Sequence, residues 1–466
     1  MGITSILNIA RNALFAQQTS LQVLSNNIAN VNTKGYARQE AVLTEADAVM
    51  TDSGLIMGNG VRIEKVMSYY DKFLEYSVAK QCTSMEEQKT YAKFFSRIES
   101  VLDENNSQLT SNITAFFNSW QSLSADPLSG VARLDAATKA TNLCGSIRNT
   151  YNELRTLQIE TDNNVANQVT EINNLLASIA ELNKKTYESS AGGSEAAGFA
   201  SQRLSALQEL SGKLNLQYFE DENGGLTVMT TDGKSLVEKG NVYELSAEKT
   251  GADNFYHVYW QGNSAYSVDI TNNISGGTLK SLVDLRDNQL GTFIDDVNDL
   301  AQSLMTEVNA IHSTGYNAGG TTGVNFFENM TRDYAANLDL SDEIKTDVNY
   351  IAVTSLASNL TNNDIALAIA DLGSADVTIG GATTTYVTYT ASIASTIGNL
   401  SQNAQNLSEY HQNLMDMVSN QRESISGVSI DEEMSNLIKF QYAYQAAARL
   451  INTADTLMTA LMEIGR

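Results

Sequence analysis

Apolar residues recur every seven positions near both ends of the chain. The front row is Leu7, Leu14, Leu21 and Ile28, and a companion row three residues later is Ala10, Gln17, Leu24 and Val31. The back row is Ile430, Leu437, Tyr444, Ile451 and Met458, with Phe440, Ala447, Ala454 and Leu461 as companions. This heptad spacing is typical of helices that pack lengthwise on one another. We predict that the N- and C-terminal helices pair as a coiled coil.

Two interpretations of these stripes are open. Heptads at chain ends are often ordinary bundle helices packing on their own core, and they can also form an assembly seam. The other faces of both helices are also apolar, with Ile6, Phe15, Val23, Ile438 and Tyr442 among them. A helix that is apolar nearly all round must be buried on several sides, which favours further partners. The candidate assembly interface is Leu7, Leu14, Leu21, Leu24, Ile28, Leu437, Tyr444, Ile451, Met458 and Leu461.

The chain between the two ends is mostly helical in pattern. Three- and four-residue apolar spacing predicts helices over about 69–102, 113–123, 130–187, 196–214, 276–312 and 393–425. Asp126-Pro127 breaks the second from the third, and Ser429 with Glu432 forms the capping-box pattern before the last helix. Short extended pieces are expected at 41–43 and 60–66, and a Thr-rich extended piece at 377–390.

Residues 215–275 have a different pattern of apolar and polar residues from the helical segments. Alternating runs such as 226–230 and 256–260 are separated by turn dipeptides, Asn223-Gly224, Asp232-Gly233, Gly240-Asn241 and Gly262-Asn263. The predicted fold is therefore mainly α with a β-rich insertion. We assign residues 1–38 and 428–466 to a terminal coiled-coil assembly domain, 39–214 and 276–427 to a long-helix rod domain, and 215–275 to a β-rich outer domain.

Composition narrows the possible partners. The 466 residues carry 54 acids and 29 bases, a formal net charge of −25, without a basic run. Nucleic acid is therefore not an expected partner, because binding a polyanion needs clustered Lys and Arg. A single proline suits long helices. No apolar run is long enough to span a membrane, and the N-terminus lacks the pattern of a secretory signal, so export would need a route that does not read one.

The sequence shows no catalytic or metal-binding constellation. His257, His312 and His411 lie in separate segments without an acid at ligand spacing, and there is no HExxH motif. We interpret Asp295, Asp296 and Asp299 as a solvated acidic face, His312 as a structural turn residue, and Trp120 and Trp260 as core residues. The glycines between 319 and 323 lack the lysine of a phosphate loop. We expect no enzymatic activity and no cofactor.

Residues 26–36 read Asn-Asn-Ile-Ala-Asn-Val-Asn-Thr-Lys-Gly-Tyr, a helix end that turns into an extended segment. We predict that Gly35 is the helix-ending or left-handed residue of this turn. This segment resembles the N-terminal signature of the bacterial flagellar axial proteins of rod, hook and hook–filament junction. Its signature positions here are Asn27, Asn30, Asn32, Gly35 and Tyr36, and Lys34 stands where the family usually has proline. Arg38-Gln39 is most similar to the junction members. Further blocks resemble them at 116–133, 309–327 and 427–449.

The resemblance implies a structural subunit that joins hook to filament. It implies self-association in a ring or helical tube, contacts with the hook protein and a second junction protein, and a cytoplasmic chaperone on the C-terminal helix. It also implies unfolded export through the flagellar type III route to an extracellular place in the flagellum. Because no apolar run could span a bilayer, we expect no membrane partner. From the apolar terminal helices we expect ends that are partly disordered in the free subunit and become ordered on assembly.

Two other functions are open from the sequence. A hook or rod subunit would share both ends, but hook proteins are mostly β between them. A secreted adhesin would use residues 215–275 to bind a surface, and sugar binding by that segment would support it.

Overall fold

The computed structural model describes residues 2–33, 35–50, 56–189, 194–221, 224–251, 254–262 and 266–464. Lys34 and the predicted turn residues Asn223 and Asn263 lie outside these ranges. The chain divides into two compact units. The first comprises Met1–Glu87, Asn167–Leu279 and Tyr410–Arg466, and the second comprises Gln88–Ala166 and Lys280–Glu409. We describe each unit by itself.

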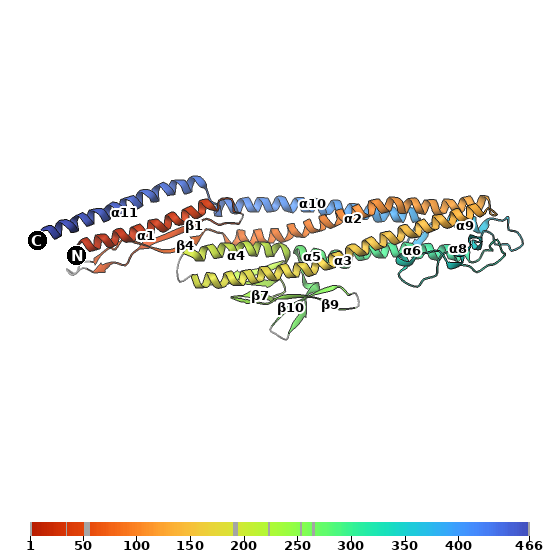
Figure 1. The fold of residues 1–466 in the computed structure, drawn as a ribbon, viewed down its shortest axis with the longest axis horizontal. Coiled ribbons are helices and arrows are strands. Elements are labelled where there is room, and N and C mark those ends of the chain that lie inside the picture. Colours follow the sequence, from red (N-terminus) through yellow and green to blue (C-terminus); the bar gives the residue numbers. More distant parts are fainter. Residues whose placement is uncertain are drawn as a thin grey trace. The chain divides into compact units, whose positions relative to one another are not determined.

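Long helices dominate the chain (Figure 1). The helices are α1 Gly2–Ala29, α2 Lys72–Ala125, α3 Gly130–Ser189, α4 Ser194–Lys213, α5 Gly277–Asp284, α6 Leu290–His312, α7 Tyr334–Asn337, α8 Asp342–Thr346, α9 Asp364–Asp371, α10 Tyr386–Ser426 and α11 Ile430–Ile464. Short helical turns are η1 Thr271–Asn273, the π-helical η2 Leu285–Gln289, and η3 Val348–Tyr350.

The strands form small antiparallel sheets. They are β1 Gln39–Glu45, β2 Val49–Met50, β3 Ile56–Met57, β4 Val61–Ser68, β5 Leu216–Glu220, β6 Leu226–Thr230, β7 Ser235–Glu238, β8 Asn241–Val242, β9 Leu245–Lys249, β10 Tyr256–Gln261, β11 Ser267–Asp269, β12 Val377–Ile379 and β13 Ala382–Thr384. Seven of them, β5 to β11, fall within 215–275. The predicted class, mainly α with a β-rich insertion, is confirmed.

The structure differs from the helix prediction in three details. The segments 69–102 and 113–123 form one helix, α2, because neither glycine nor proline lies between them to end it. The helix predicted over 276–312 is interrupted by the π-helical turn η2. The Thr-rich piece 377–390 is extended only in β12 and β13, since α10 already begins at Tyr386.

The terminal helices lie side by side in the first unit. α1 and α11 pack along each other and run antiparallel, so both chain ends lie at the same end of the pair (Figure 1). β1 and β4 form an antiparallel ribbon that packs on α1. Val23 of α1, Val66 of β4 and Ala197 of α4 form a small buried cluster at this packing. The ribbon therefore covers a face of α1 that α11 leaves free.

The rest of the first unit joins helices to the β-rich insertion. Val78 and Cys82 of α2 pack with Met415 of α10. The insertion holds a four-stranded sheet in the order β5-β6-β7-β8 and a three-stranded sheet in the order β11-β10-β9. Asn183 of α3 anchors the first sheet, because its buried amide donates to the carbonyls of Leu226 and Lys239 at 2.7 and 2.8 Å.

The second unit is built around a cluster of buried aromatic rings. Phe116 and Trp120 of α2 pack against Phe326 and Phe327, with ring centroids 5.1 to 5.9 Å apart for the pairs Phe116–Phe326, Phe116–Phe327 and Trp120–Phe326. His312 closes the cluster, its centroid 5.4 Å from that of Phe326. These rings come from the two internal blocks, 116–133 and 309–327, that resemble the junction proteins. The interpretation of Trp120 as a core residue is confirmed.

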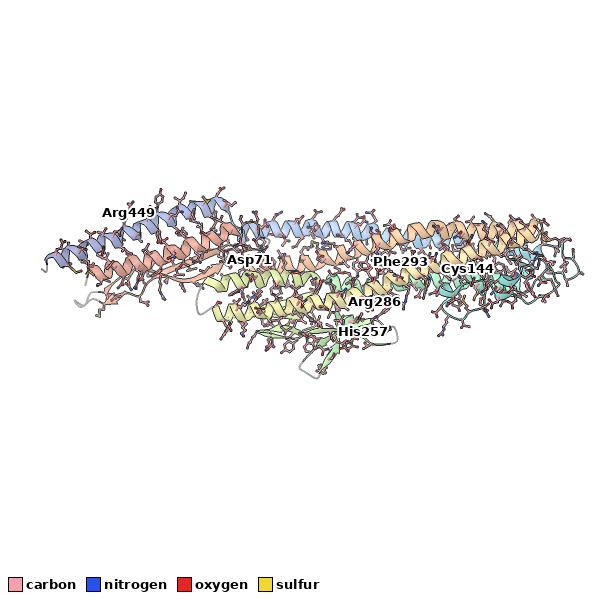
Figure 2. The ribbon with its side chains drawn as sticks, viewed as in Figure 1. Asp71, Cys144, His257, Arg286, Phe293 and Arg449 are labelled. Carbon is pink, nitrogen blue, oxygen red and sulfur yellow. The ribbon has the colours of Figure 1, made fainter. Side chains whose placement is uncertain are left out.

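Two buried arginines of the second unit have polar partners. Arg286, labelled in Figure 2, is buried. Its guanidinium lies 2.8 Å from Asp162 and 2.6 Å from Asp287. Gln158 donates to the carbonyl of Arg286 at 2.8 Å. Arg133 of α3 donates to the carbonyls of Ile351 and Pro127. These contacts satisfy charges that would otherwise be costly to bury.

Candidate assembly interface at the chain termini

The predicted interface rows are buried unequally by the α1–α11 pair. The companion rows are deepest, since Ala10, Leu24, Ala447 and Ala454 are 0, 3, 4 and 1% exposed. Leu7, Leu14, Leu21, Ile28, Leu437 and Ile451 are half-buried. Tyr444, Met458 and Leu461 are exposed. The small alanines let the two helices approach closely, and the larger side chains of the first rows lie along the edge of the contact.

The remaining faces of α11 carry large apolar side chains in solvent. Ile438 and Tyr442, on the face away from the alanine row, are 51 and 68% exposed. Leu450 and Leu457 are 49 and 47% exposed, one residue before Ile451 and Met458 of the predicted row. A helix with apolar residues on every side is not fully covered by one antiparallel partner.

Asn27 is the centre of a buried hydrogen-bond network where α1 ends. Its amide donates to the carbonyl of Gln39 at 2.8 Å and to Glu433 at 3.0 Å. Its oxygen accepts from the backbone N–H of Gln39 at 3.0 Å and from the Tyr36 hydroxyl at 2.9 Å. The two hydrogen bonds with Gln39 are the pair that a residue of an adjacent antiparallel strand would make. The Asn27 side chain therefore takes the place of such a residue at the edge of β1.

Arg38 and Glu433 extend the network to the start of α11. The Arg38 guanidinium lies 3.2 Å from Glu433 and 3.4 Å from Glu432, and the Arg38 backbone N–H donates to the carbonyl of Ser426. Burial, together with the charge of Glu433, raises the pKa of Tyr36 to about 12, so this phenol stays a donor. Residues from both ends of the chain therefore share one buried polar site.

The other signature positions lie beside this network. Asn30 bonds within its own helix end, donating to the Asn26 carbonyl at 3.0 Å, and Asn32 is exposed. Gly35 has φ +82, the left-handed conformation predicted for it. Its carbonyl accepts from Arg422 at 2.8 Å, and buried Arg422 is paired with Glu75 at 2.5 Å. The structure thus brings Asn27 and Tyr36 together and leaves Asn30 and Asn32 outside.

Sequence reasoning missed the residues that close the network. Glu433 stands seven residues before Phe440 in the companion row, where it is the polar exception, and no local pattern points to Arg422. An acid at a seam position signals a buried partner, since an unpaired carboxylate there would be costly. The identity of that partner was not readable, because Asn27 and Glu433 are 406 positions apart.

The other candidate chemical groups have structural surroundings. His312 is buried, accepts from the Ala352 N–H through Nε2 at 2.9 Å, and faces the Val324 carbonyl with Nδ1 at 2.8 Å, which confirms it as a structural residue. Of the three acids interpreted as a solvated face, Asp295 is exposed, whereas Asp296 and Asp299 are half-buried. Burial raises the pKa of Asp296, which accepts from Tyr389 at 3.2 Å.

No group of three or more His, Cys, Asp or Glu side chains could hold a metal ion within the described ranges. His257 does lie beside an acid in space, with Asp269 at 3.1 Å. None of the helices, over the same part of the chain, is both long and apolar enough to cross a membrane.

Three family models match the chain. The model described as the flagellar hook-associated protein FlgK helical domain matches residues 95–327, half of the chain. The C-terminal model of the flagellar basal body rod FlgEFG proteins matches residues 419–464, and the flagella basal body rod protein model matches residues 7–36. The ends are thus of a type shared with rod proteins, whereas the helical middle matches the hook-associated family.

Similar proteins cover nearly the whole chain. Flagellar hook-associated protein 1 of Bacillus subtilis (strain 168) is 28% identical over 490 residues, covering 97% of this chain and 96% of its own. The Escherichia coli (strain K12) protein of the same name is 26% identical and covers 99% of this chain and 100% of its own. The solved structure of the flagellar hook junction protein FlgK from Burkholderia pseudomallei has the same fold, with a TM-score of 0.68 at 13% identity, over 75% of this chain and all of that one.

Paired terminal helices, long helices between them and the buried signature network define an axial structural protein of the bacterial flagellum. The matching relatives are structural proteins of that organelle. The chain belongs to the FlgK family of flagellar hook-associated proteins, and it is a structural subunit of the hook–filament junction. The resemblance seen in the signature residues is confirmed, and the hook or rod alternative is set aside.

Proposed function

We propose that the subunit takes its place in the flagellum through α1 and α11, whose exposed apolar side chains are buried by other copies and by neighbouring axial proteins. The observation that carries this proposal is the exposure of Ile438 and Tyr442 on the outer face of α11. In a protein that worked as a monomer, this face would be an aggregation hazard. In an assembling subunit it is the surface that drives association.

The predicted interface residues fit this role through their partial burial. Leu7, Leu14, Leu21 and Ile28 on α1, and Leu437 and Ile451 on α11, keep part of their surface for a further partner after the two helices have paired. Each fully buried Leu or Ile contributes about 1.5–3 kcal/mol. Residues 1–38 and 428–466 act as the assembly domain. They order fully only when neighbouring copies in a ring or helical tube complete that burial.

Membership of the family supports a proposal for the neighbours and the export route of the subunit. Its neighbours along the axis are the hook protein and a second junction protein, and a cytoplasmic chaperone covers α11 before export. Export uses the flagellar type III route without a cleaved signal, and the mature subunit is extracellular. Segments 39–214 and 276–427 serve as the rod domain and 215–275 as an outer domain. The subunit has a structural role and no enzymatic one.

The test compares serine substitutions on two exposed surfaces. Ile438→Ser with Tyr442→Ser removes the outer apolar face of α11, and Tyr187→Ser is the matched control, because Tyr187 is 66% exposed but lies on α3. Each variant replaces the native chain in cells, and attached filaments are counted by electron microscopy. We expect the α11 variant to be exported but to leave most hooks without filaments, and the control to behave as the native chain. Normal filament attachment by the α11 variant would overturn the proposal.

A further inference from the structure

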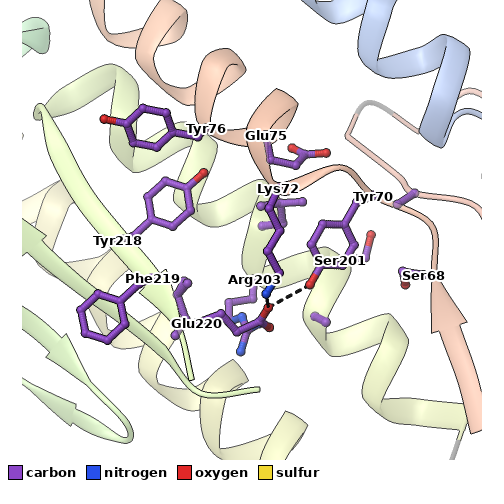
Figure 3. A pocket seen from close by; sticks show the side chains of 14 residues that line it. Ser68, Tyr70, Lys72, Glu75, Tyr76, Ser201, Arg203, Tyr218, Phe219 and Glu220 are labelled. Carbon is purple, nitrogen blue, oxygen red and sulfur yellow. Dashed lines mark hydrogen bonds and ion pairs between the residues drawn. The ribbon is translucent and has the colours of Figure 1, made fainter. Parts of the chain in front are cut away.

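A cavity of about 300 Å³ lies in the first unit between α2, α4 and β5 (Figure 3). Tyr70, Tyr76, Tyr218 and Phe219 supply aromatic rings to its wall. Tyr76 and Tyr218 face each other with ring centroids 6.0 Å apart. The cavity takes no part in the network at Asn27, and its lining is mostly apolar. Its volume is at the lower end of the range for small-molecule sites.

One wall of the cavity is a closed group of charges. Glu220 accepts from Arg203 at 2.8 Å, lies 3.0 Å from Lys72 and accepts from the Tyr70 hydroxyl at 2.9 Å (Figure 3). Burial tends to raise the pKa of Glu220, but the hydrogen bonds from Lys72 and Tyr70 and the charge of Arg203 outweigh it, and the pKa is lowered. Glu220 therefore stays ionised and matched by its cations.

The second acid of the lining is also paired. Glu75 is 5% exposed and accepts from Arg422 at 2.5 Å. The lining holds two acids, Glu75 and Glu220, and both are already paired. Arg422 pairs with Glu75, and Arg203 and Lys72 both pair with Glu220, so a cationic ligand would find no free carboxylate. The electrostatics of the cavity therefore favour a ligand without a positive charge.

The Tyr218 hydroxyl supplies an unused hydrogen-bond donor. Its oxygen is buried and has no hydrogen-bond partner among the residues that the structure describes. The ring projects from β5 toward α2, with the hydroxyl directed to the side where Glu75 and Tyr76 lie (Figure 3). Burial raises the pKa of this phenol, so the proton remains available. A buried donor without an acceptor is costly unless a water or a ligand supplies one.

We propose that this cavity binds a neutral pyranose ring, free or at the end of a glycan. A pyranose has an apolar face that packs on aromatic rings, and it has oxygens that can accept from Tyr218 and Ser201 of the lining. A pyranose also carries no charge, which suits a lining whose carboxylates are already paired. The site is separate from the α1–α11 surface, so it adds a ligand to a subunit whose known role is structural.

Saturation-transfer NMR on the full chain tests the proposal, with N-acetylglucosamine as the probe. We expect transfer to the sugar at low-millimolar affinity. Tyr218→Phe removes only the hydroxyl and should weaken binding about 3- to 10-fold, and Phe219→Ala should weaken it about 10-fold by removing an exposed ring. Tyr442→Phe, which makes the same change on α11, should leave binding unchanged.

Stability separates a ligand role of Tyr218 from a structural one. Because its hydroxyl has no partner in the described chain, Tyr218→Phe should leave thermal unfolding unchanged or slightly raised while it weakens sugar binding. No transfer to the sugar at about 20 mM, or transfer that neither pocket variant weakens, would overturn the proposal. Binding of indole in place of the sugar would also overturn it, in favour of a site for an aromatic side chain. Binding of inorganic phosphate in place of the sugar would overturn it in favour of an anion site.

Discussion

The aromatic core of the second unit is fully covered by its own chain, whereas the α1–α11 pair leaves large apolar side chains exposed. The four largest rings of this core, Trp120, Phe116, Phe326 and Phe327, are 0% exposed. Residues of the same chain surround each of them. Tyr442 of α11 is 68% exposed, although α11 also carries many large apolar side chains. Both regions are rich in large hydrophobic side chains, so hydrophobicity alone does not distinguish them. The difference is whether the chain itself supplies the covering residues.

This difference separates a region complete within one chain from a region completed by others. Substitutions in the aromatic core should destabilise the free subunit, whereas substitutions on the outer face of α11 should act on assembly and leave the free subunit almost unchanged. The hydrogen-bond network at Asn27 is intermediate between these two regions. Its groups are buried, but they join helices α1 and α11, whose other faces are only partly covered.

The largest effect is expected in the aromatic core. Phe326→Ala should lower the free energy of unfolding of the second unit by about 3–5 kcal/mol, through lost burial and the cavity left behind. Hydrogen exchange of α6 amides under urea measures this without relying on two-state unfolding of the whole chain. Phe219→Ala is the matched control, since that ring is 55% exposed, and it should change little. Equal effects of the two variants would contradict the comparison.

Acid should weaken the same core through His312. Burial lowers the pKa of His312 from 6.5 to about 4, so the folded protein holds the ring neutral. As the pH falls, His312 takes up a proton near pH 6.5 in the unfolded chain but only near pH 4 in the folded one. The free energy of unfolding therefore decreases as the pH falls from 6.5 to 4. The loss approaches about 3 kcal/mol.

His312→Gln isolates this contribution from the carboxylates that titrate in the same range. The glutamine amide can offer both a donor and an acceptor, but it does not titrate. Urea unfolding followed at α6 between pH 7 and 4 should show a steeper decline for the native chain than for the variant. Parallel declines would show that His312 does not couple protonation to folding.

A smaller effect is expected at the signature network. Asn27→Ala leaves the Gln39 backbone groups, Tyr36 and Glu433 without a shared partner and should destabilise the junction of α1 and α11 by about 1–3 kcal/mol. Asn32→Ala, at an exposed signature position, is the control and should have almost no effect. Amide exchange in β1 and at the start of α11, measured in the assembled junction where both ends are ordered, reports the change.

The smallest effect on the free subunit is expected on the outer face of α11. Tyr442→Ala should change the free energy of unfolding by less than about 0.5 kcal/mol, because the side chain is largely exposed. The same change should impair attachment of filaments in cells. A clear loss of stability in the isolated chain would show that Tyr442 packs within the subunit.

Periodicity was enough to predict most helices, because the apolar rows of α3 and α6 are buried where the spacing placed them. Ile147, Leu154 and Ile172 on α3, Leu282 on α5, and Leu300 and Leu304 on α6 are all below 4% exposed. Local turn chemistry predicted Gly35 as a left-handed residue. Both signals act within a few neighbouring positions, which is why a single sequence contains them.

Long-range pairings could not be predicted in this way. The bond from Asn27 to Glu433, the ion pair of Arg422 with Glu75, and the closure of the cavity by Tyr70 and Tyr218 join residues that no local pattern relates. The register of β1 on β4 contains a bulge after Val42, which also follows from tertiary packing. Such contacts require the fold, and they decide which signature residues act together.

The most direct test of the account is residue-resolved hydrogen exchange with limited proteolysis on the dilute free chain and on the assembled junction. Before assembly, we expect rapid exchange and cleavage in the segments preceding Arg38 and following Gly427, with protection through α3, α4 and α6. Assembly should then protect both ends. Ends that are already fully protected and uncleaved in the dilute chain would contradict completion by neighbouring copies and would show that α1 and α11 form a closed pair on their own.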